Sequence, residues 1–98
     1  MAQFDAVKLR SGEFVVVLQS DLVDYLPTRL VAPLVPIDEA PSKVDRLNPI
    51  VTIDGRQYLI AVHLAATVPA RQIGPTEMML RDYDFMIKAA LDILISGF

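Results

Sequence analysis

The sequence contains no cysteine, and it has a single histidine among its 98 residues. Without cysteine the chain has no disulfide framework, no thiolate zinc site and no cysteine nucleophile, and a reducing compartment is the expected environment. His63 stands at the end of a strand-like run, and no neighbouring residue is marked as the partner that a catalytic imidazole requires. We therefore expect no catalytic site.

Basic residues are also too few and too dispersed to form a clear cluster. The formal net charge is −3 and the pI is about 4.9, with nine lysines and arginines scattered along the chain. This argues against a protein that holds nucleic-acid backbones, because such binding needs clustered positive charge. No apolar run approaches the roughly 20 residues of a membrane span, and residues 1–5 have neither the basic nor the apolar region of an export signal. The expected location is the cytoplasm, with no membrane partner.

Glycines are few and isolated, so the sequence contains no phosphate-binding loop. Asp21 and Asp24 lie three residues apart, as ligands of a hard cation could. Polar residues before a short turn are more often caps, however, and Ser20 to Asp24 has that pattern. We expect neither a metal site nor a cofactor.

Apolar residues are what the sequence has in excess, at 53% of the chain. The usual share in globular domains is about 45 to 50%. A chain of 98 residues forms one domain, residues 1–98, and folding removes roughly 60 to 70% of its surface from water. A domain of this size cannot bury the whole excess, so we expect self-association or an apolar partner.

The first third of the chain predicts short β-strands. Residues 3–9 and 13–19 form a hairpin about a turn at 10–12, and the apolar run within the second strand suits burial on both faces. A short capped turn follows at 20–25. Residues 30–35 predict a further strand, which the prolines at and beside it confine to a sheet edge or a bend.

A second hairpin is the clearest local signal in the sequence. Two strand-like runs, 50–53 and 56–62, are joined by Asp54-Gly55, a dipeptide that supplies the positive φ angles of a type I′ turn. The proline-containing stretch 36–49 before it predicts a loop or a small excursion from the main sheet. Residues 68–73 can add one more strand before Gly74-Pro75 breaks the chain.

The C-terminal stretch from Arg81 to Phe98 predicts one helix that is apolar nearly all round. An inward-facing stripe recurs at helical spacing: Tyr83, Met86, Ile87, Ala90, Leu91 and Leu94. A second apolar set falls outside that stripe: Phe85, Ala89, Ile93 and Ile95. One face should pack on the domain and the other should meet a second molecule. The expected fold is mainly β (α+β), a small, partly closed antiparallel barrel with a helix across it.

Short segments spread along the whole chain also match a known pattern. They are Gln3-Phe4, Val17 to Asp24, Arg29, Pro33-Leu34, Lys43-Val44, Arg46-Leu47, Pro49, Val51, Ile53, Ala66, Val68-Pro69, Ile73-Gly74, Ile87-Lys88, Ala90 and Gly97-Phe98. In their order, spacing and total length they resemble the CcdB family, toxins of bacterial toxin-antitoxin modules that poison DNA gyrase. No single segment is diagnostic by itself.

The resemblance implies an SH3-like partly open barrel with a small accessory sheet and a long C-terminal helix, paired as a homodimer through the core. It implies a type II toxin without catalytic activity, of the kind linked to plasmid maintenance. Such a toxin binds the DNA gyrase A subunit, traps the gyrase-DNA cleavage complex and is neutralised by a CcdA-like antitoxin.

Matched position by position, the resemblance assigns gyrase binding to Leu22, Val23, Asp92, Ile95, Ser96, Gly97 and Phe98. Ser96 replaces the indole that usually precedes the final glycine, and Asp92 replaces an asparagine. Since aromatic anchors commonly contribute about 2 kcal/mol or more, losing the indole could weaken poisoning more than tenfold.

The N-terminal hairpin turn is a separate candidate for antitoxin binding. Its residues Lys8, Arg10, Ser11 and Gly12 form a positively charged tip on an otherwise acidic protein. Two alternative functions stay open: a ribonuclease toxin on the same SH3-like scaffold, which would need a cationic site and a base, and a dimeric binding module that has lost toxicity through Ser96 and Asp92.

Overall fold

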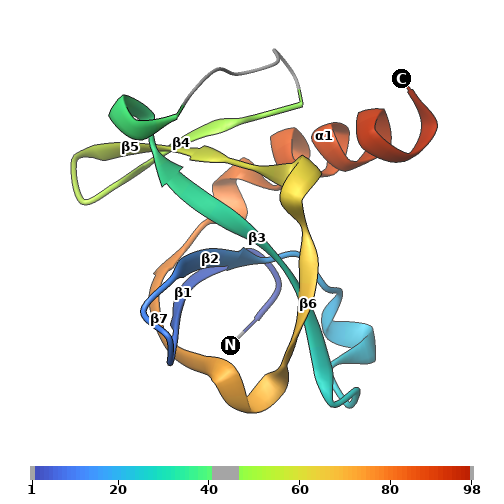
Figure 1. Ribbon diagram of the computed structural model, residues 1–98. Coiled ribbons are helices and arrows are strands. Elements are labelled where there is room, and N and C mark those ends of the chain that lie inside the picture. Colours follow the sequence, from blue (N-terminus) through green and yellow to red (C-terminus); the bar gives the residue numbers. More distant parts are fainter. Residues whose placement is uncertain (1, 41–46, 98) are drawn as a thin grey trace.

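The computed structural model describes residues 2–40 and 47–97, and there the chain forms seven strands, five 3-10 turns and one α-helix (Figure 1). The strands are β1 (Asp5–Leu9), β2 (Phe14–Val17), β3 (Thr28–Pro36), β4 (Ile50–Ile53), β5 (Arg56–Ile60), β6 (Ala66–Pro69) and β7 (Ile73–Met79). The helices are η1 (Asp21–Val23), η2 (Ile37–Glu39), η3 (Val62–Leu64), η4 (Ala70–Gln72), η5 (Arg81–Tyr83) and α1 (Asp84–Ser96). The family matches at Lys43, Val44 and Arg46 and the terminal Phe98 lie outside the described residues.

All strand pairs are antiparallel, and they form two connected sheets. The core sheet has the order β7-β1-β2-β3-β6 and curls into a half-open barrel (Figure 1). The last part of β3 leaves it and pairs with β5, which pairs with β4 to make a small accessory sheet. The helix α1 lies beside the accessory sheet. This confirms the expected α+β fold, an SH3-like barrel with an accessory sheet and a C-terminal helix.

Strand β2 is buried on both of its faces, as the sequence predicts. Val15 and Val17 point to one side of the core sheet, and Val16 and Leu18 point to the other. The first side is the concave one, where all five core strands contribute to a cluster of Val7, Leu9, Val15, Val17, Val31, Val68 and Ile73. The second side faces the accessory sheet and α1, which supply Val51, Ile53, Ile60, Ile87 and Ala90 to the larger cluster.

Strand β3 is central, so of the two expected placements, a sheet edge or a bend, the edge is wrong. It pairs with both β2 and β6 at Val31, and its final residues pair with β5. Pro33 lies at the change of partner, where it stands opposite Val15 and its carbonyl accepts the N–H of Ala61 at 2.9 Å. A proline is tolerated at this point because its missing N–H falls where the hydrogen-bonding ladder passes from one neighbour to the next.

Strand β7 runs through Gly74 and Pro75, so the predicted chain break at these residues is also wrong. The residues expected to form one strand, 68–73, instead end β6, turn through η4 and begin β7. Pro75 is accommodated because β7 is the last strand of the sheet. Gly74 is required by close packing: a Cβ atom there would lie 2.5 Å from the carbonyl oxygen of Lys8.

The hairpin β4–β5 has the turn that its sequence predicts. Asp54 and Gly55 have φ angles of 51° and 78°, the positive values that a type I′ turn needs at both central residues. The accessory sheet is tied to the start of the helix region by the backbone N–H of Thr52, which donates to the Tyr83 hydroxyl at 3.2 Å.

The C-terminal helix is shorter than predicted and buries a narrower stripe. It starts as the 3-10 turn η5 and becomes α-helical only at Asp84. Ile87 and Ala90 are fully buried, whereas Met86 and Leu94, which the helical spacing placed inside, are exposed. Asp84 and Lys88, four residues apart on the exposed side of the helix, form an ion pair with Lys88 Nζ 3.9 Å from Asp84 Oδ2.

Candidate functional site

The turn η1 presents the first pair of predicted gyrase-binding residues. Ser20 caps it, because its Oγ accepts the backbone N–H of Leu22 at 3.1 Å, which confirms the predicted cap. The Leu22 side chain is 88% exposed, and Val23 beside it is partly buried. A large apolar side chain on a capped turn, pointing into solvent, is available to a partner and contributes little to the core.

Hydrogen bonds from other parts of the chain hold this turn in place. The Asp21 Oδ1 atom accepts the backbone N–H of Gln3 at 2.9 Å. The Gln19 side chain donates to the Val23 carbonyl at 2.9 Å and accepts the Leu30 N–H at 3.0 Å. These roles of Gln19 and Asp21 could not be predicted from the sequence, because hydrogen bonds between distant residues leave no periodic pattern. These hydrogen bonds therefore hold the turn η1, and with it Leu22, in one position.

The chain after η1 extends the exposed apolar surface. Tyr25 is 77% exposed and Leu26 is also exposed. Arg29 holds this stretch by donating from its guanidinium to the carbonyl oxygens of Asp24 and Leu26. Tyr25 was not among the predicted site residues, and an aromatic residue next to an exposed leucine is a common anchor in protein interfaces.

The end of α1 presents the second predicted surface. Asp92, Ser96 and Ile95 are exposed, Ile95 at 79%. Gly97 ends the helix in the left-handed conformation with a φ of 82°, and its N–H donates to the Ile93 carbonyl at 2.9 Å. Phe98, the last predicted gyrase-binding residue, lies outside the described residues.

One protomer does not bring these two surfaces together. Figure 1 shows η1 beside the lower part of the core sheet and the C-terminal end of α1 at the opposite end of the molecule. A partner that touches both Leu22 and Ile95 must therefore be large, or must contact more than one copy of the chain.

The predicted antitoxin residues lie at the tip of the β1–β2 hairpin. Lys8, Arg10, Ser11 and Gly12 are all exposed. The tip is held by the Gly12 N–H, which donates to the Leu9 carbonyl at 2.8 Å, and by the Arg10 N–H, which donates to the Gln72 carbonyl at 2.8 Å. Figure 1 shows this tip on the other side of the curled sheet from η1, so the two candidate surfaces are separate.

The remaining chemistry of the described chain is limited. His63 lies exposed on η3, with its Nδ1 atom 3.2 Å from the Asn48 side-chain nitrogen. Within residues 2–40 and 47–97, no three side chains of histidine, cysteine, aspartate or glutamate are grouped as a metal site would require. In the same residues no helix is long and apolar enough to cross a bilayer.

Comparison with protein families identifies a relationship over nearly the whole chain. The family model of the CcdB protein matches residues 3–97, nearly the whole chain, and so takes in both η1 and the end of α1. A search of curated proteins finds no match. The end-to-end family match, together with the half-open barrel, accessory sheet and terminal helix, shows that the chain belongs to the CcdB family, the toxins of toxin-antitoxin systems.

Proposed function

We propose that this chain is a type II toxin that binds the DNA gyrase A subunit and traps the gyrase-DNA cleavage complex, without catalytic activity of its own. Membership of the CcdB family supports this proposal. The observation that carries it is the exposure of Leu22 on a turn fixed by hydrogen bonds from Gln3, Ser20 and Gln19. A protein surface is the expected target, because the site presents an exposed apolar anchor.

Burial of Leu22 by a partner would release a substantial free energy. Complete removal of a leucine side chain from water contributes roughly 1.5 to 3 kcal/mol. Because η1 is held in place before binding, little of that energy is lost in ordering the turn. Ile95 at the end of α1 offers a second exposed anchor of the same kind.

The functional unit in this proposal is a homodimer paired through the core sheet. Large apolar side chains are exposed in the single chain, among them Leu22, Tyr25, Met79 and Ile95. Two-fold pairing would bury part of this surface and give the target two copies of each anchor. Sedimentation at micromolar concentration should give a dimer, and a species of about 11 kDa alone would contradict it.

Neutralisation by a CcdA-like antitoxin completes the proposal. Such an antitoxin would use a disordered tail that folds on the toxin and buries apolar surface while paying the cost of ordering. The hairpin tip with Lys8 and Arg10 is the candidate contact, since both side chains are exposed and the protein as a whole is acidic.

Growth of cells that express the chain tests the proposal. Expression should stop growth, and a gyrase A-subunit substitution that confers resistance should restore it. The Leu22→Gln variant should lose toxicity, whereas Leu64→Gln, which changes an exposed leucine on the 3-10 turn η3, should keep it. Toxicity with RNA decay and no rescue would favour a ribonuclease instead. No toxicity would favour a binding module that has lost the activity.

A further inference from the structure

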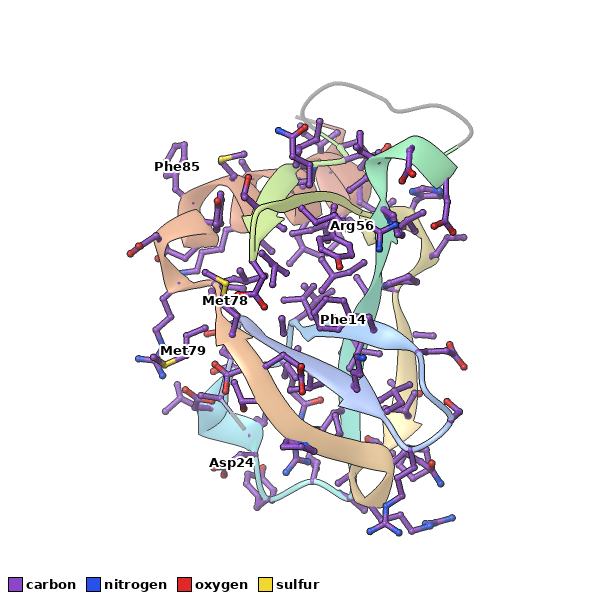
Figure 2. The ribbon with its side chains drawn as sticks, turned by 90° about the vertical axis from the view of Figure 1, so that its left-hand side faces the viewer. Phe14, Asp24, Arg56, Met78, Met79 and Phe85 are labelled. Carbon is purple, nitrogen blue, oxygen red and sulfur yellow. The ribbon has the colours of Figure 1, made fainter. Side chains whose placement is uncertain are left out.

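A cleft of about 270 Å³ lies between the core sheet and the β4–β5 hairpin, away from η1 and the end of α1. Its lining includes Lys8 of β1, Phe14 of β2, Glu77 of β7, and Asp54, Arg56 and Tyr58 of the hairpin. Figure 2 shows the face on which the cleft opens, with Phe14 and Arg56 pointing toward the same region and Met78 beside them.

The floor of the cleft is aromatic. The rings of Phe14 and Tyr58 meet edge to face, with centroids 5.3 Å apart and planes at 80°. The Arg56 guanidinium carbon lies 5.7 Å from the centroid of the Tyr58 ring, so the protein already places one cation on this floor. Such rings accept both aliphatic stems and positive charge.

The charges around the cleft leave an excess of free carboxylate. Arg56 lines the cleft, but its charge is already paired with two carboxylates, 3.6 Å from Asp38 and 3.3 Å from Glu39. Asp54 and Glu77 form no ion pair with any described residue, and Lys8 is the one lining cation that is equally free. Two free negative charges therefore stand against one free positive charge, and the cleft is complementary to a cation.

A β-bulge directs Glu77 to this place. Ala6 pairs with Met78 and Val7 pairs with Thr76, so Glu77 is an extra residue on β7. A bulge of this kind turns two successive side chains toward one face of a sheet and is a common way to re-aim a side chain. Since Glu77 lines the cleft, the irregular register places it in the same cleft that Asp54 of the hairpin lines.

The neighbouring edge of the sheet is open. Among the described strands β7 pairs only with β1, and its outer backbone groups have no partner strand. Met78 and Met79 are exposed along this edge (Figure 2). An exposed apolar edge strand is the surface on which an extended polypeptide adds by main-chain hydrogen bonds.

We propose that the cleft receives a lysine or arginine side chain of a partner protein whose chain lies extended along the free edge of β7. The aliphatic stem of that side chain packs on Phe14 and Tyr58, and its charged head lies between Asp54 and Glu77. The backbone of the same segment pairs with β7 and covers Met79. This surface is separate from the one assigned to gyrase, and it shares Lys8 alone with the antitoxin tip.

Titration of the isotope-labelled full chain with short peptides tests this proposal by NMR. A blocked five-residue peptide that alternates valine and lysine should shift the amide signals of Phe14 and of residues 77–79. The matching valine-glutamate peptide should not. A version with a central proline keeps the charge but loses a backbone donor, and it should bind more weakly than the parent peptide.

Charge-removing variants give the decisive comparison. Glu77→Gln and Asp54→Asn should each weaken binding of the lysine peptide roughly two- to fivefold, since exposed ion pairs are weak. Asparagine tolerates the positive φ of position 54, so the turn is kept. Asp82→Asn, which removes an exposed carboxylate of η5, should have no effect. Equal binding of both charged peptides, or no shift at residues 77–79, would overturn the proposal.

Discussion

The backbone N–H of Gln3 donates a hydrogen bond to Asp21 Oδ1 at 2.9 Å and so ties the start of the chain to the turn η1. The next residue, Phe4, packs in the larger core cluster with Ile87, and Lys88 Nζ lies 5.8 Å from the centroid of its ring. Two consecutive residues therefore connect η1 to α1, the elements that carry the two candidate gyrase-binding surfaces.

The conformation of Phe4 shows how firmly this connection is made. Its φ angle of 68° is unusual for a residue other than glycine. Its N–H donates to the Val17 carbonyl at 2.7 Å and its carbonyl accepts the Leu80 N–H at 2.8 Å, so the end of β2 and the residue after β7 both hold it. Strained backbone persists only where the surrounding structure over-determines it. The N-terminal segment is thus part of the platform that positions Leu22.

Asp21→Ala removes the acceptor for the Gln3 N–H and should loosen η1. We expect the melting temperature to fall by about 2 to 8 °C, as for the loss of one surface hydrogen bond in a domain of this size. Gyrase inhibition should weaken by more than the loss of stability explains, because Leu22 is no longer held in place. Thermal unfolding and a supercoiling assay measure the two effects. Asp24→Ala is the control, since no side-chain bond of Asp24 to a described residue is present.

Ile87→Ala should be strongly destabilising, because Ile87 is fully buried where α1 meets both sheets. Large-to-small substitutions at such sites cost about 2 to 5 kcal/mol. Phe85→Ala, two residues earlier in the same helix, removes a larger side chain that is 81% exposed, and it should change stability by less than about 0.5 kcal/mol. Urea unfolding of both variants makes the comparison. Similar losses would mean that the helix docks on a different face.

The sequence predicts those parts of the fold that are determined by residues close together in the chain. The β4–β5 hairpin follows from Asp54-Gly55, and the two-faced burial of β2 follows from its apolar run. Strand β7 was missed because Gly74 resembles a chain break in isolation. Its actual role is a close approach to the Lys8 carbonyl, which depends on a contact between residues distant in sequence.

In the candidate site too, features set by neighbouring residues could be predicted, whereas features that depend on contacts distant in sequence could not. The cap at Ser20 is a local signal and was predicted. Hydrophobic periodicity could not show that Leu22 is exposed, since a leucine on a short turn is equally compatible with burial, and only the family resemblance identified it. The Gln19 bonds to Val23 and Leu30 and the Tyr25 surface depend on how β3 returns past η1, which no spacing in the sequence reveals.

Reversal of charge at Lys8 and Arg10 together should weaken antitoxin binding. Both side chains are exposed at the hairpin tip, on the other side of the sheet from η1, so gyrase inhibition should stay largely intact. Calorimetric titration with the antitoxin tail and a supercoiling assay give the two readouts. Arg81→Glu, a charge reversal elsewhere on the surface, should leave antitoxin affinity unchanged. If the double variant also binds normally, the tip is not the antitoxin surface.

The C-terminal tail, residues 96–98, allows gyrase binding to be tested separately from folding. The residues of α1 that are at least partly buried end at Ile93, and Gly97 contributes only a capping bond to the Ile93 carbonyl at an exposed helix end. Deletion of Gly97 and Phe98 should therefore leave the melting temperature within a few degrees, as expected for a loss of less than about 1 kcal/mol. It should nevertheless abolish gyrase inhibition, because it removes the terminal anchor and the glycine that lets the backbone approach a partner.

Ser96→Trp should act in the opposite direction. Ser96 is exposed beside Ile95, so an indole can be added there without disturbing the core. A buried aromatic anchor commonly contributes about 2 kcal/mol or more at an interface, which corresponds to an increase in affinity of more than tenfold. Ser96→Ala, which adds no anchor, should inhibit gyrase as the parent does. A deletion variant that unfolds or stays fully active would show that the tail is not the gyrase-binding site. A tryptophan variant that inhibits gyrase no more strongly than the alanine variant would show the same.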